Sequence, residues 1–165
     1  MIVLGVDPGL ATLGWGVIEA ERGRQRLGVD YGCILTTPQQ SFPDRLCQIG
    51  RDMRALLRQY RPEEIAFEEL FFARNVTTAL TVGAARGVSL AACAEYTDRL
   101  YEYTPMQVKQ AIVGYGKAEK QQVQQMVKLL LHMQDIARPD DAADAIAIAL
   151  THAATGPARE QFKMK

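Results

Sequence analysis

The sequence predicts one α/β domain whose mixed β-sheet is covered by helices on both faces. Its 165 residues suit a single domain with a sizeable buried core. Residues 1–6 form an uninterrupted apolar run, which is typical of a buried strand. Strand-like segments at 13–18 and 26–36 follow after short connections, which favours an antiparallel meander. From residue 41 onward helical and strand patterns alternate, and this order is typical of a mixed α/β sheet.

The segment between Ser41 and Pro62 is predicted to form the first helix. Ser41 can cap it, Asp44 lies three residues further on, and Pro43 is tolerated in a first turn. Apolar residues then recur at helical spacing until Pro62 ends the helix. A short apolar strand at 65–68 follows and finishes in acid.

The remaining segments continue the alternation. The helix expected at 76–96 is rich in small residues, which let a helix pack close to a sheet. The polar end of the chain is expected to fray. The prediction is therefore one domain over 1–155 and a frayed polar tail over 156–165. Within the domain a strand is expected at 101–103 and helices at 106–113, 118–131 and 140–154.

The composition limits the kinds of site and the cellular location. Three cysteines without CxxC spacing make a disulfide framework or a zinc knuckle unexpected, and a reducing compartment fits best. Two histidines are too few for a histidine-built metal site, so a metal would sit on carboxylates, which favours Mg²⁺ or Mn²⁺. No segment approaches the roughly 18–20 apolar residues of a membrane span, and no basic region marks a signal peptide. We therefore expect a cytoplasmic protein with no membrane partner.

The formal net charge is zero, which taken alone argues mildly against a nucleic-acid binder. The charges are unevenly distributed, however. Five arginines fall between residues 45 and 61, and four lysines fall between 109 and 128. Asp140, Asp141 and Asp144 form a tight acidic set, and a metal bound there would make the working surface more positive.

Four acids are placed where a metal site could form. Asp7 ends the first predicted strand and Glu68 ends the fourth, and sites in open α/β sheets lie outside the carboxyl ends of strands. Asp141 and Asp144 are three residues apart and share one face at the start of the last helix. Four clustered carboxylates would repel one another without cations. Two metal ions held this way could drive phosphodiester hydrolysis.

Each acid also has a structural interpretation. Asp7 could start a turn before Pro-Gly, and Asp140 or Asp141 could cap the last helix and complement its dipole. For Asp140 we favour capping. Glu69 competes with Glu68 for the strand position, and strand alternation alone does not choose between them.

Motifs along almost the whole chain resemble those of the RuvC family of junction resolvases. They occur in the family's order and in a chain of suitable size. The matching segments are Val-Asp-Pro-Gly-Leu at 6–10, Gly-Trp-Gly-Val at 14–17, Ala-Phe-Glu-Glu-Leu-Phe at 66–71, Gln-Val-Lys-Gln at 107–110, Ala-Glu-Lys at 118–120 and Asp-Ala-Ala-Asp-Ala-Ile-Ala-Ile-Ala at 141–149.

The resemblance implies a ribonuclease H-like fold, with a five-stranded mixed sheet and helices on both faces. It implies that the metal-binding, catalytic carboxylates are Asp7, Glu68, Asp141 and Asp144. It implies Mg²⁺, with Mn²⁺ as a substitute and two ions per site. Some family members carry histidine at the last of these positions, whereas this chain has Asp144.

The resemblance also implies how DNA is bound and cut. Lys109 and Lys120 match lysines that contact the phosphate backbone, and Phe71 matches an aromatic residue that stacks on bases at the branch point. Phe72, Arg74 and Lys117 are further candidate DNA contacts. The family acts as a homodimer on four-way junctions, leaves 5′-phosphate and 3′-hydroxyl ends in two symmetric nicks, and works with the RuvA–RuvB machinery.

Three other functions remain open at this stage. Sugar-kinase and actin-like ATPases share the opening Asp-x-Gly, but they need a second domain and a second glycine-rich loop. A YqgF-type nuclease has a similar first strand, but it fits the lysine segment and the terminal motif less well. A junction-binding protein without catalysis would not need all four acids.

Overall fold

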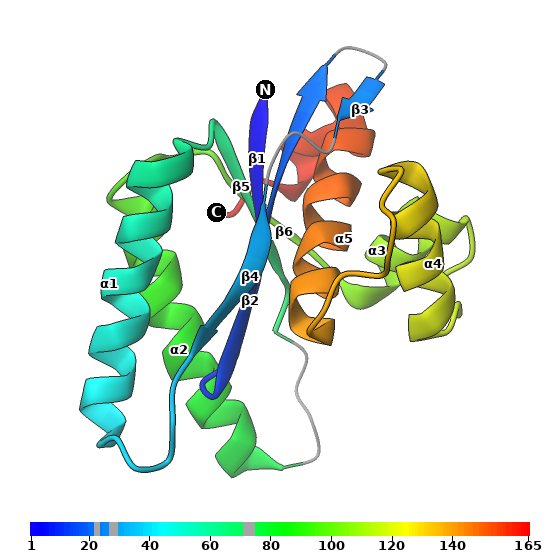
Figure 1. Cartoon of the computed structure of the whole chain (residues 1–165). Coiled ribbons are helices and arrows are strands. Elements are labelled where there is room, and N and C mark those ends of the chain that lie inside the picture. The colour runs from blue at the N-terminus through cyan, green and yellow to red at the C-terminus, as the bar shows by residue number, and fades with distance from the viewer. Residues whose placement is uncertain (22–23, 27–29, 71–74) are drawn as a thin grey trace.

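The computed structural model describes the chain except for residues 22–23, 27–29 and 71–74 (Figure 1). The predicted elements are present, and most of their bounds agree within two residues. The strands are β1 (Ile2–Asp7), β2 (Thr12–Glu21), β3 (Arg24–Arg26), β4 (Tyr31–Leu35), β5 (Glu64–Glu68) and β6 (Leu100–Tyr103). The helices are α1 (Phe42–Tyr60), α2 (Val76–Ala94), α3 (Pro105–Val113), α4 (Lys120–Leu130) and α5 (Asp140–Thr155), followed by the 3₁₀ helix η1 (Gly156–Phe162).

The strands form one mixed sheet with β1 near its middle. β1 pairs antiparallel with β2 and parallel with β5, and β5 pairs parallel with β6. β3 and β4 both pair antiparallel with β2, along different stretches of it. The six strands therefore fill five positions, and the strand predicted at 26–36 is present as two pieces. The predicted five-stranded mixed sheet is confirmed.

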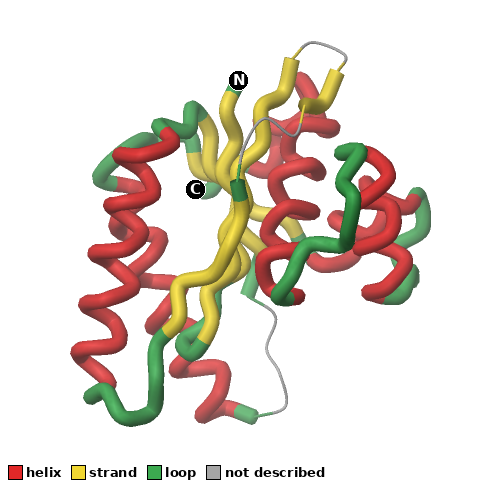
Figure 2. The backbone as a smooth tube through the Cα atoms, viewed as in Figure 1, coloured by secondary structure: helices red, strands yellow, loops and turns green. Residues whose placement is uncertain are grey.

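Two helical layers enclose this sheet (Figure 2). α1 and α2 pack against each other on one face, and α5 lies on the other face against β1 and β2. α3 and α4 pack on the outer side of α5. The predicted first-helix cap is also confirmed, because the Ser41 side chain accepts a hydrogen bond from the Asp44 backbone at the start of α1.

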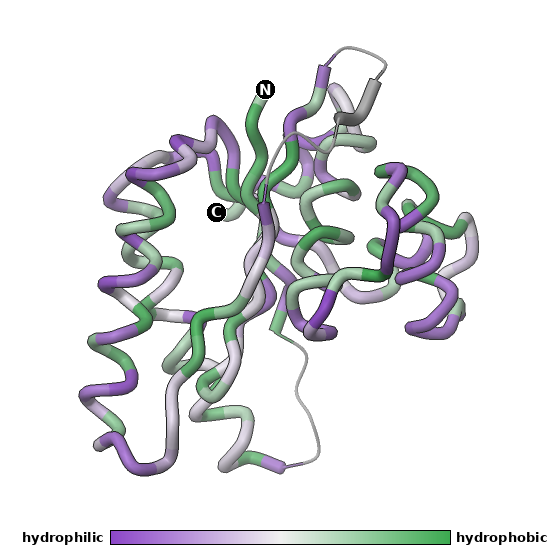
Figure 3. The backbone as a smooth tube through the Cα atoms, in the orientation of Figure 1, coloured by the Kyte–Doolittle hydropathy of each residue, from purple (hydrophilic) through white to green (hydrophobic). Residues whose placement is uncertain are grey.

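Each face of the sheet contributes to its own hydrophobic core. Leu4 and Val6 of β1 pack with α1 and α2, whereas Val3 packs with α5. Because β1 is buried on both faces, it reads as the continuous apolar run seen in the sequence. In Figure 3 hydrophilic and hydrophobic residues alternate along α1, as expected of a helix with one exposed face.

The closest helix–sheet contact is made by α5. A Cβ added to Gly5 would lie 2.0 Å from the Ala145 carbonyl oxygen, and one added to Gly14 would lie 2.0 Å from that of Asp141. Glycines on the strands thus let the backbone of α5 rest directly on β1 and β2. We expected this role for the small residues of α2, but nothing lies within 4 Å of a Cβ added to Gly83 or Gly87. Small residues of α2 do enter the core, since Ala85 and Ala92 are buried there, but the two glycines of α2 are not needed for close packing.

The end of the chain is ordered, in contrast to the frayed tail that its polar composition suggested. Residues 156–162 form η1, and the Phe162 ring lies 4.8 Å from the Tyr103 ring. Lys163 bridges to Tyr101 at the edge of β6, and the Met164 backbone donates to the Leu100 carbonyl. Apolar contacts and backbone pairing at the sheet edge thus outweigh the polar composition of the tail.

α2 is also long and apolar enough to cross a membrane, with a mean hydropathy of 1.3, which our expectation of no such segment had missed. Length and composition alone are weak evidence, since helices in protein cores pass the same test. Here Arg86, within α2, contacts Glu102 of β6 at 2.8 Å. This ion pair and the packing on α1 attach α2 to the rest of the fold.

Candidate active site

Asp7 and Glu68 meet at the carboxyl ends of two neighbouring parallel strands. Asp7 is the last residue of β1 and Glu68 is the last residue of β5. The preceding residues, Val6 and Phe67, are register partners, so the two acids emerge side by side. Their side chains share a hydrogen bond. The expected convergence of these two carboxylates is confirmed.

α5 brings the other two acids to the same edge of the sheet. Asp141 lies in its first turn, and the contact between Gly14 and the Asp141 carbonyl fixes this end of the helix on β2. Asp144 follows three residues later on the same side. Both carboxylates act on the titration of Asp7, which places all four acids in one electrostatic cluster.

The cluster carries strong unbalanced negative charge. Burial raises the pKa of Asp7 to about 8, and the charges of Glu68, Asp144 and Asp141 add to the rise. Burial and the charge of Asp144 likewise raise the pKa of Glu68, and burial raises the pKa of Asp144. Without a bound cation, Asp7 therefore holds a proton at neutral pH and shares it with Glu68 through their hydrogen bond.

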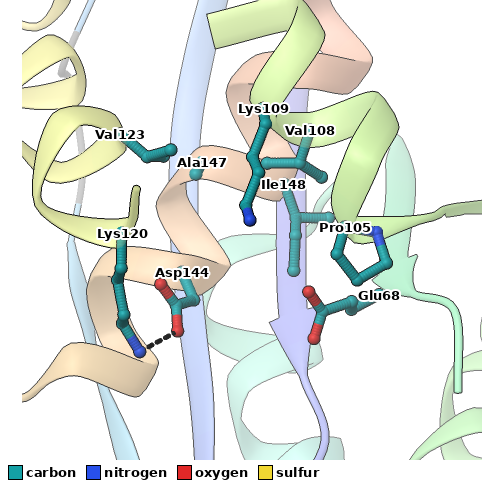
Figure 4. Close-up of a pocket in the computed structure, with 9 residues that line it drawn as sticks. All are labelled: Glu68, Pro105, Val108, Lys109, Lys120, Val123, Asp144, Ala147 and Ile148. Carbon is teal, nitrogen blue, oxygen red and sulfur yellow. Dashed lines mark hydrogen bonds and ion pairs between the residues drawn. The ribbon is translucent and has the colours of Figure 1, made fainter. Parts of the chain in front are cut away.

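A cavity of about 210 Å³ opens beside these acids. Figure 4 shows Glu68 on one side and Asp144 on the other, with Lys109 of α3 pointing between them. Lys120, the first residue of α4, lies at the margin next to Asp144. The rest of the wall is mainly apolar and is formed by Pro105, Val108, Val123, Ala147 and Ile148.

Two lysines partly compensate the negative charge. The Lys120 ammonium lies 2.7 Å from Oδ2 of Asp144, and this contact lowers the pKa of Asp144 against the effect of burial. The charges of Lys120 and Lys109 also act to lower the pKa of Glu68. The same ammonium groups are suited to contact a phosphate that enters the cavity.

The donor set fits a hard divalent cation. All four side chains offer carboxylate oxygens, which Mg²⁺ and related ions prefer. Burial and the neighbouring carboxylates raise the pKa of Asp7, so a cation bound among them would favour its ionised form. In the part of the chain that the structure describes, no three acidic, histidine or cysteine side chains are arranged to hold an ion as they stand. Because Lys120 occupies Oδ2 of Asp144, that ion pair has to open for this oxygen to bind a cation.

The structure separates Glu68 from its neighbour Glu69. Glu68 lines the cavity, whereas Glu69 is exposed and lines a different hollow with Glu102 and Gln107. The ambiguity that strand alternation left is therefore resolved in favour of Glu68.

Of the two roles expected of Asp140, capping is wrong, whereas its place in the first turn of α5 agrees with complementing the helix dipole. Pro139 occupies the N-cap position of α5, and no side chain caps that helix. Asp140 instead accepts hydrogen bonds from Arg138 and from Gln124 of α4. The sequence held a signal for this arrangement, because Asp140 and Asp144 lie four residues apart, as do Lys120 and Gln124, and such pairs share a helix face.

The other candidate DNA contacts are not gathered at the cavity. Lys117 is exposed in the loop before α4 and does not line the cavity wall. Phe71, Phe72 and Arg74 lie outside the described residues. Their proposed contacts with DNA therefore stay predictions.

Comparison with known proteins agrees with this geometry. The family profile described as crossover junction endodeoxyribonuclease RuvC matches residues 3–152. This chain belongs to the RuvC family. A RuvC from Alkaliphilus oremlandii is 50% identical over 165 residues, covering 100% of both chains. A RuvC from Chloroflexus aurantiacus is 51% identical over 162 residues, covering 98% of both. The predicted family and its class of activity, a crossover junction endodeoxyribonuclease, are thereby confirmed.

Two solved structures share the fold. The structure "T. thermophilus RuvC in complex with Holliday junction substrate" matches with a TM-score of 0.89 and 41% identity, covering 98% of this chain and 96% of that one. The yeast mitochondrial Holliday junction resolvase Ydc2 matches with a TM-score of 0.66 and 14% identity, covering 92% of this chain and 78% of that one. At that identity the second likeness supports the fold alone.

Proposed function

We propose that this RuvC protein cuts four-way DNA junctions by metal-dependent phosphodiester hydrolysis. The observation that carries the proposal is the cluster of Asp7, Glu68, Asp141 and Asp144, in which burial and mutual repulsion raise the pKa of Asp7 to about 8. A structural role would not require four acids to gather at one edge of the sheet. The relative from T. thermophilus that was solved with a Holliday junction supports the choice of substrate.

In this proposal the four carboxylates hold Mg²⁺, or Mn²⁺ in its place, with two ions per site. Such ions activate the attacking water and stabilise charge on the leaving oxygen of the phosphodiester. The protein contributes the positions of the oxygen ligands. Strand ends fix Asp7 and Glu68, and the close packing of α5 on Gly5 and Gly14 fixes the acids on α5.

The lysines position the DNA around the cut. Lys109 points into the cavity and Lys120 stands at its margin, so both can meet oxygens of the scissile phosphate or of its neighbours. Lys117 lies further out and would contact the backbone away from the cut. Phe71 or Phe72 would stack on bases at the branch point, and Arg74 would contact the DNA backbone. The cut would leave 5′-phosphate and 3′-hydroxyl ends.

A two-fold homodimer suits this substrate, since a four-way junction has approximate two-fold symmetry and needs two symmetric nicks. α2 offers apolar surface for such contact, as Val76 and Leu80 are 72% and 70% exposed. The RuvA–RuvB branch-migration complex is the partner we infer for junction processing in the bacterial cytoplasm.

A cleavage assay tests the proposal. The purified protein is incubated with a synthetic four-way junction or with a linear duplex of the same sequence, in Mg²⁺, Mn²⁺ or EDTA. We expect paired symmetric nicks in the junction alone and none in EDTA. Asp7→Asn, Glu68→Gln, Asp141→Asn and Asp144→Asn are each expected to abolish cutting while junction binding persists.

Other results would change the assignment. Equal cutting of the linear duplex would retain a nuclease and reject junction selectivity. Tight junction binding without cutting in either metal would point to a binding module. Loss of both fold and binding in an acid variant would show that this acid is structural.

A further inference from the structure

Two pairs of side chains face each other where α4 packs on α5. Asp140 and Asp144 are four residues apart on α5, and Lys120 and Gln124 are four apart on α4, so each pair shares a helix face. Lys120 Nζ lies 2.7 Å from Asp144 Oδ2. Gln124 Nε2 donates to Asp140 Oδ1 at 3.1 Å. These two side-chain contacts connect α4 to α5.

Lys120 stands between the two acids. Its ammonium is in contact with Asp144 and lies 3.8 Å from Oδ2 of Asp140. The other oxygen of Asp140 is already engaged, because Oδ1 accepts from Gln124 and from Arg138 Nη1, the latter at 2.6 Å. Arg138 and Gln124 thus set the orientation of the Asp140 carboxylate, and Oδ2 is the oxygen that faces Lys120.

We propose that Asp140 is a positioning residue that holds Lys120 when Asp144 binds a cation. This inference rests on the proposed metal-dependent function. A divalent cation and the Lys120 ammonium compete for the same carboxylate of Asp144. When the cation binds, Lys120 passes to Asp140, a second carboxylate within 3.8 Å, and stays at the edge of the cavity.

The expected effect is modest because the groups are partly exposed. The side chains of Lys120 and Asp140 are 51% and 47% exposed, so water screens the attraction between them. Exposed ion pairs contribute little, and removing this one should weaken cation binding by about twofold to fivefold. The sign of the effect follows from the two ion pairs that Lys120 makes with described residues. Without the charge of Asp140 the ion pair with Asp144 remains, so Lys120 competes more strongly with the cation there.

A double-mutant cycle on cation binding tests this inference. Mn²⁺ binding is measured from the loss of the free-ion signal in electron paramagnetic resonance, without DNA and without cutting. The proteins are wild type, Asp140→Asn, Lys120→Gln and the double variant. Asp140→Asn keeps the oxygen that accepts from Arg138 and Gln124 but loses the charge. Asp135→Asn, which alters an exposed acid with no ion pair to the described residues, is the charge-matched control.

We expect Asp140→Asn to weaken Mn²⁺ binding in wild type and to have little effect in the Lys120→Gln background. Asp135→Asn should leave binding unchanged in both. An equal weakening in both backgrounds would mean that Asp140 acts only through its charge on the cation, and would overturn the inference. Unchanged binding in Asp140→Asn would also overturn it. If wild type itself binds no Mn²⁺, the proposed metal site fails instead, and this outcome is distinct from the other two.

Discussion

Gly14 on β2 lies directly against the Asp141 backbone on α5, and a Cβ at position 14 would come within 2.0 Å of the Asp141 carbonyl oxygen. The obstructing atom belongs to the backbone, so the helix itself has to move. Gly14→Ala should therefore shift the end of α5 that carries Asp141 and Asp144. We expect the free energy of unfolding to fall by about 1–3 kcal/mol, and cutting to fall by more than the loss of folded protein explains. Chemical denaturation and a cleavage assay on the folded fraction measure both effects.

Gly87→Ala is the matched control, because nothing lies within 4 Å of a Cβ added at that position of α2. It should raise the free energy of unfolding by about 0.5–1 kcal/mol, since glycine inside a helix is less favourable than alanine. An unchanged cutting rate in folded Gly14→Ala would show that the position of α5 is not controlled by this contact.

Asp7→Asn should stabilise the protein in the absence of metal. The pKa of Asp7 is raised from an ordinary 3.8 to about 8, so the folded state binds the proton more tightly than the unfolded state. The favourable contribution of the protonated group is fully present below pH 3.8 and is lost as the pH rises to about 8. The Asp7→Asn variant should not lose stability in this way, because its amide does not titrate. We expect the free energy of unfolding of the variant to exceed that of wild type by an amount that grows with pH. This difference should reach a few kcal/mol, which corresponds to on the order of one to three pKa units.

Urea unfolding in EDTA between pH 4 and pH 8.5 measures this difference. Asp135→Asn should show no comparable growth with pH, because Asp135 is exposed. If the free energies of unfolding of Asp7→Asn and wild type differed by the same amount at every pH, that result would contradict a raised pKa of Asp7.

Local pattern allowed much of the site to be predicted. The apolar run of β1 ends at Asp7, and the run of β5 ends at Glu68, so strand ends located two acids before their pairing was known. The spacing of Asp141 and Asp144 located the other two on one helix face. The choice between Glu68 and Glu69 was different, because it depends on which side of β5 faces α3 and α5. Strand alternation does not contain that information.

The missed features depend on contacts between distant segments. Asp140 was expected to cap α5 because the sequence does not show that Gln124 and Arg138 reach it. The tail was expected to fray because most of its residues are polar, and its composition does not show that Phe162 packs on Tyr103. Both contacts form only after the layers have assembled.

Lys109→Ala should weaken junction binding in a way that depends on salt. Lys109 points into the cavity between Glu68 and Asp144, where a phosphate would enter (Figure 4). Loss of one phosphate contact should reduce the slope of the logarithm of the junction-binding constant against the logarithm of the salt concentration by about 0.9. Binding titrations from about 50 to 200 mM salt cover a suitable range. Lys128→Ala, in the last turn of α4, is the control and should change the slope less. Equal slopes for wild type and Lys109→Ala would count against a direct phosphate contact.

A buried polar chain through His152 joins β5 and β6 to α5. His152 Nε2 lies 2.7 Å from Glu64, and its Nδ1 lies 2.8 Å from the Tyr103 hydroxyl. Burial lowers the pKa of His152 even though Glu64 acts to raise it. The folded state therefore favours neutral His152, and the stability that this group contributes is lost as the pH falls below its ordinary value of 6.5.

His152→Gln should remove this part of the acid sensitivity. At pH 7.5 the variant should be less stable by about 1–3 kcal/mol, because Glu64 and Tyr103 lose buried hydrogen-bond partners. Between pH 6.5 and pH 5 wild type should lose up to about 1.4 kcal/mol per pH unit more than the variant. Denaturation at each pH gives both slopes, and His132→Gln, at an exposed position, should follow wild type. Parallel slopes for wild type and His152→Gln would show that His152 keeps an ordinary pKa despite its burial, and that the acid sensitivity of the fold arises elsewhere.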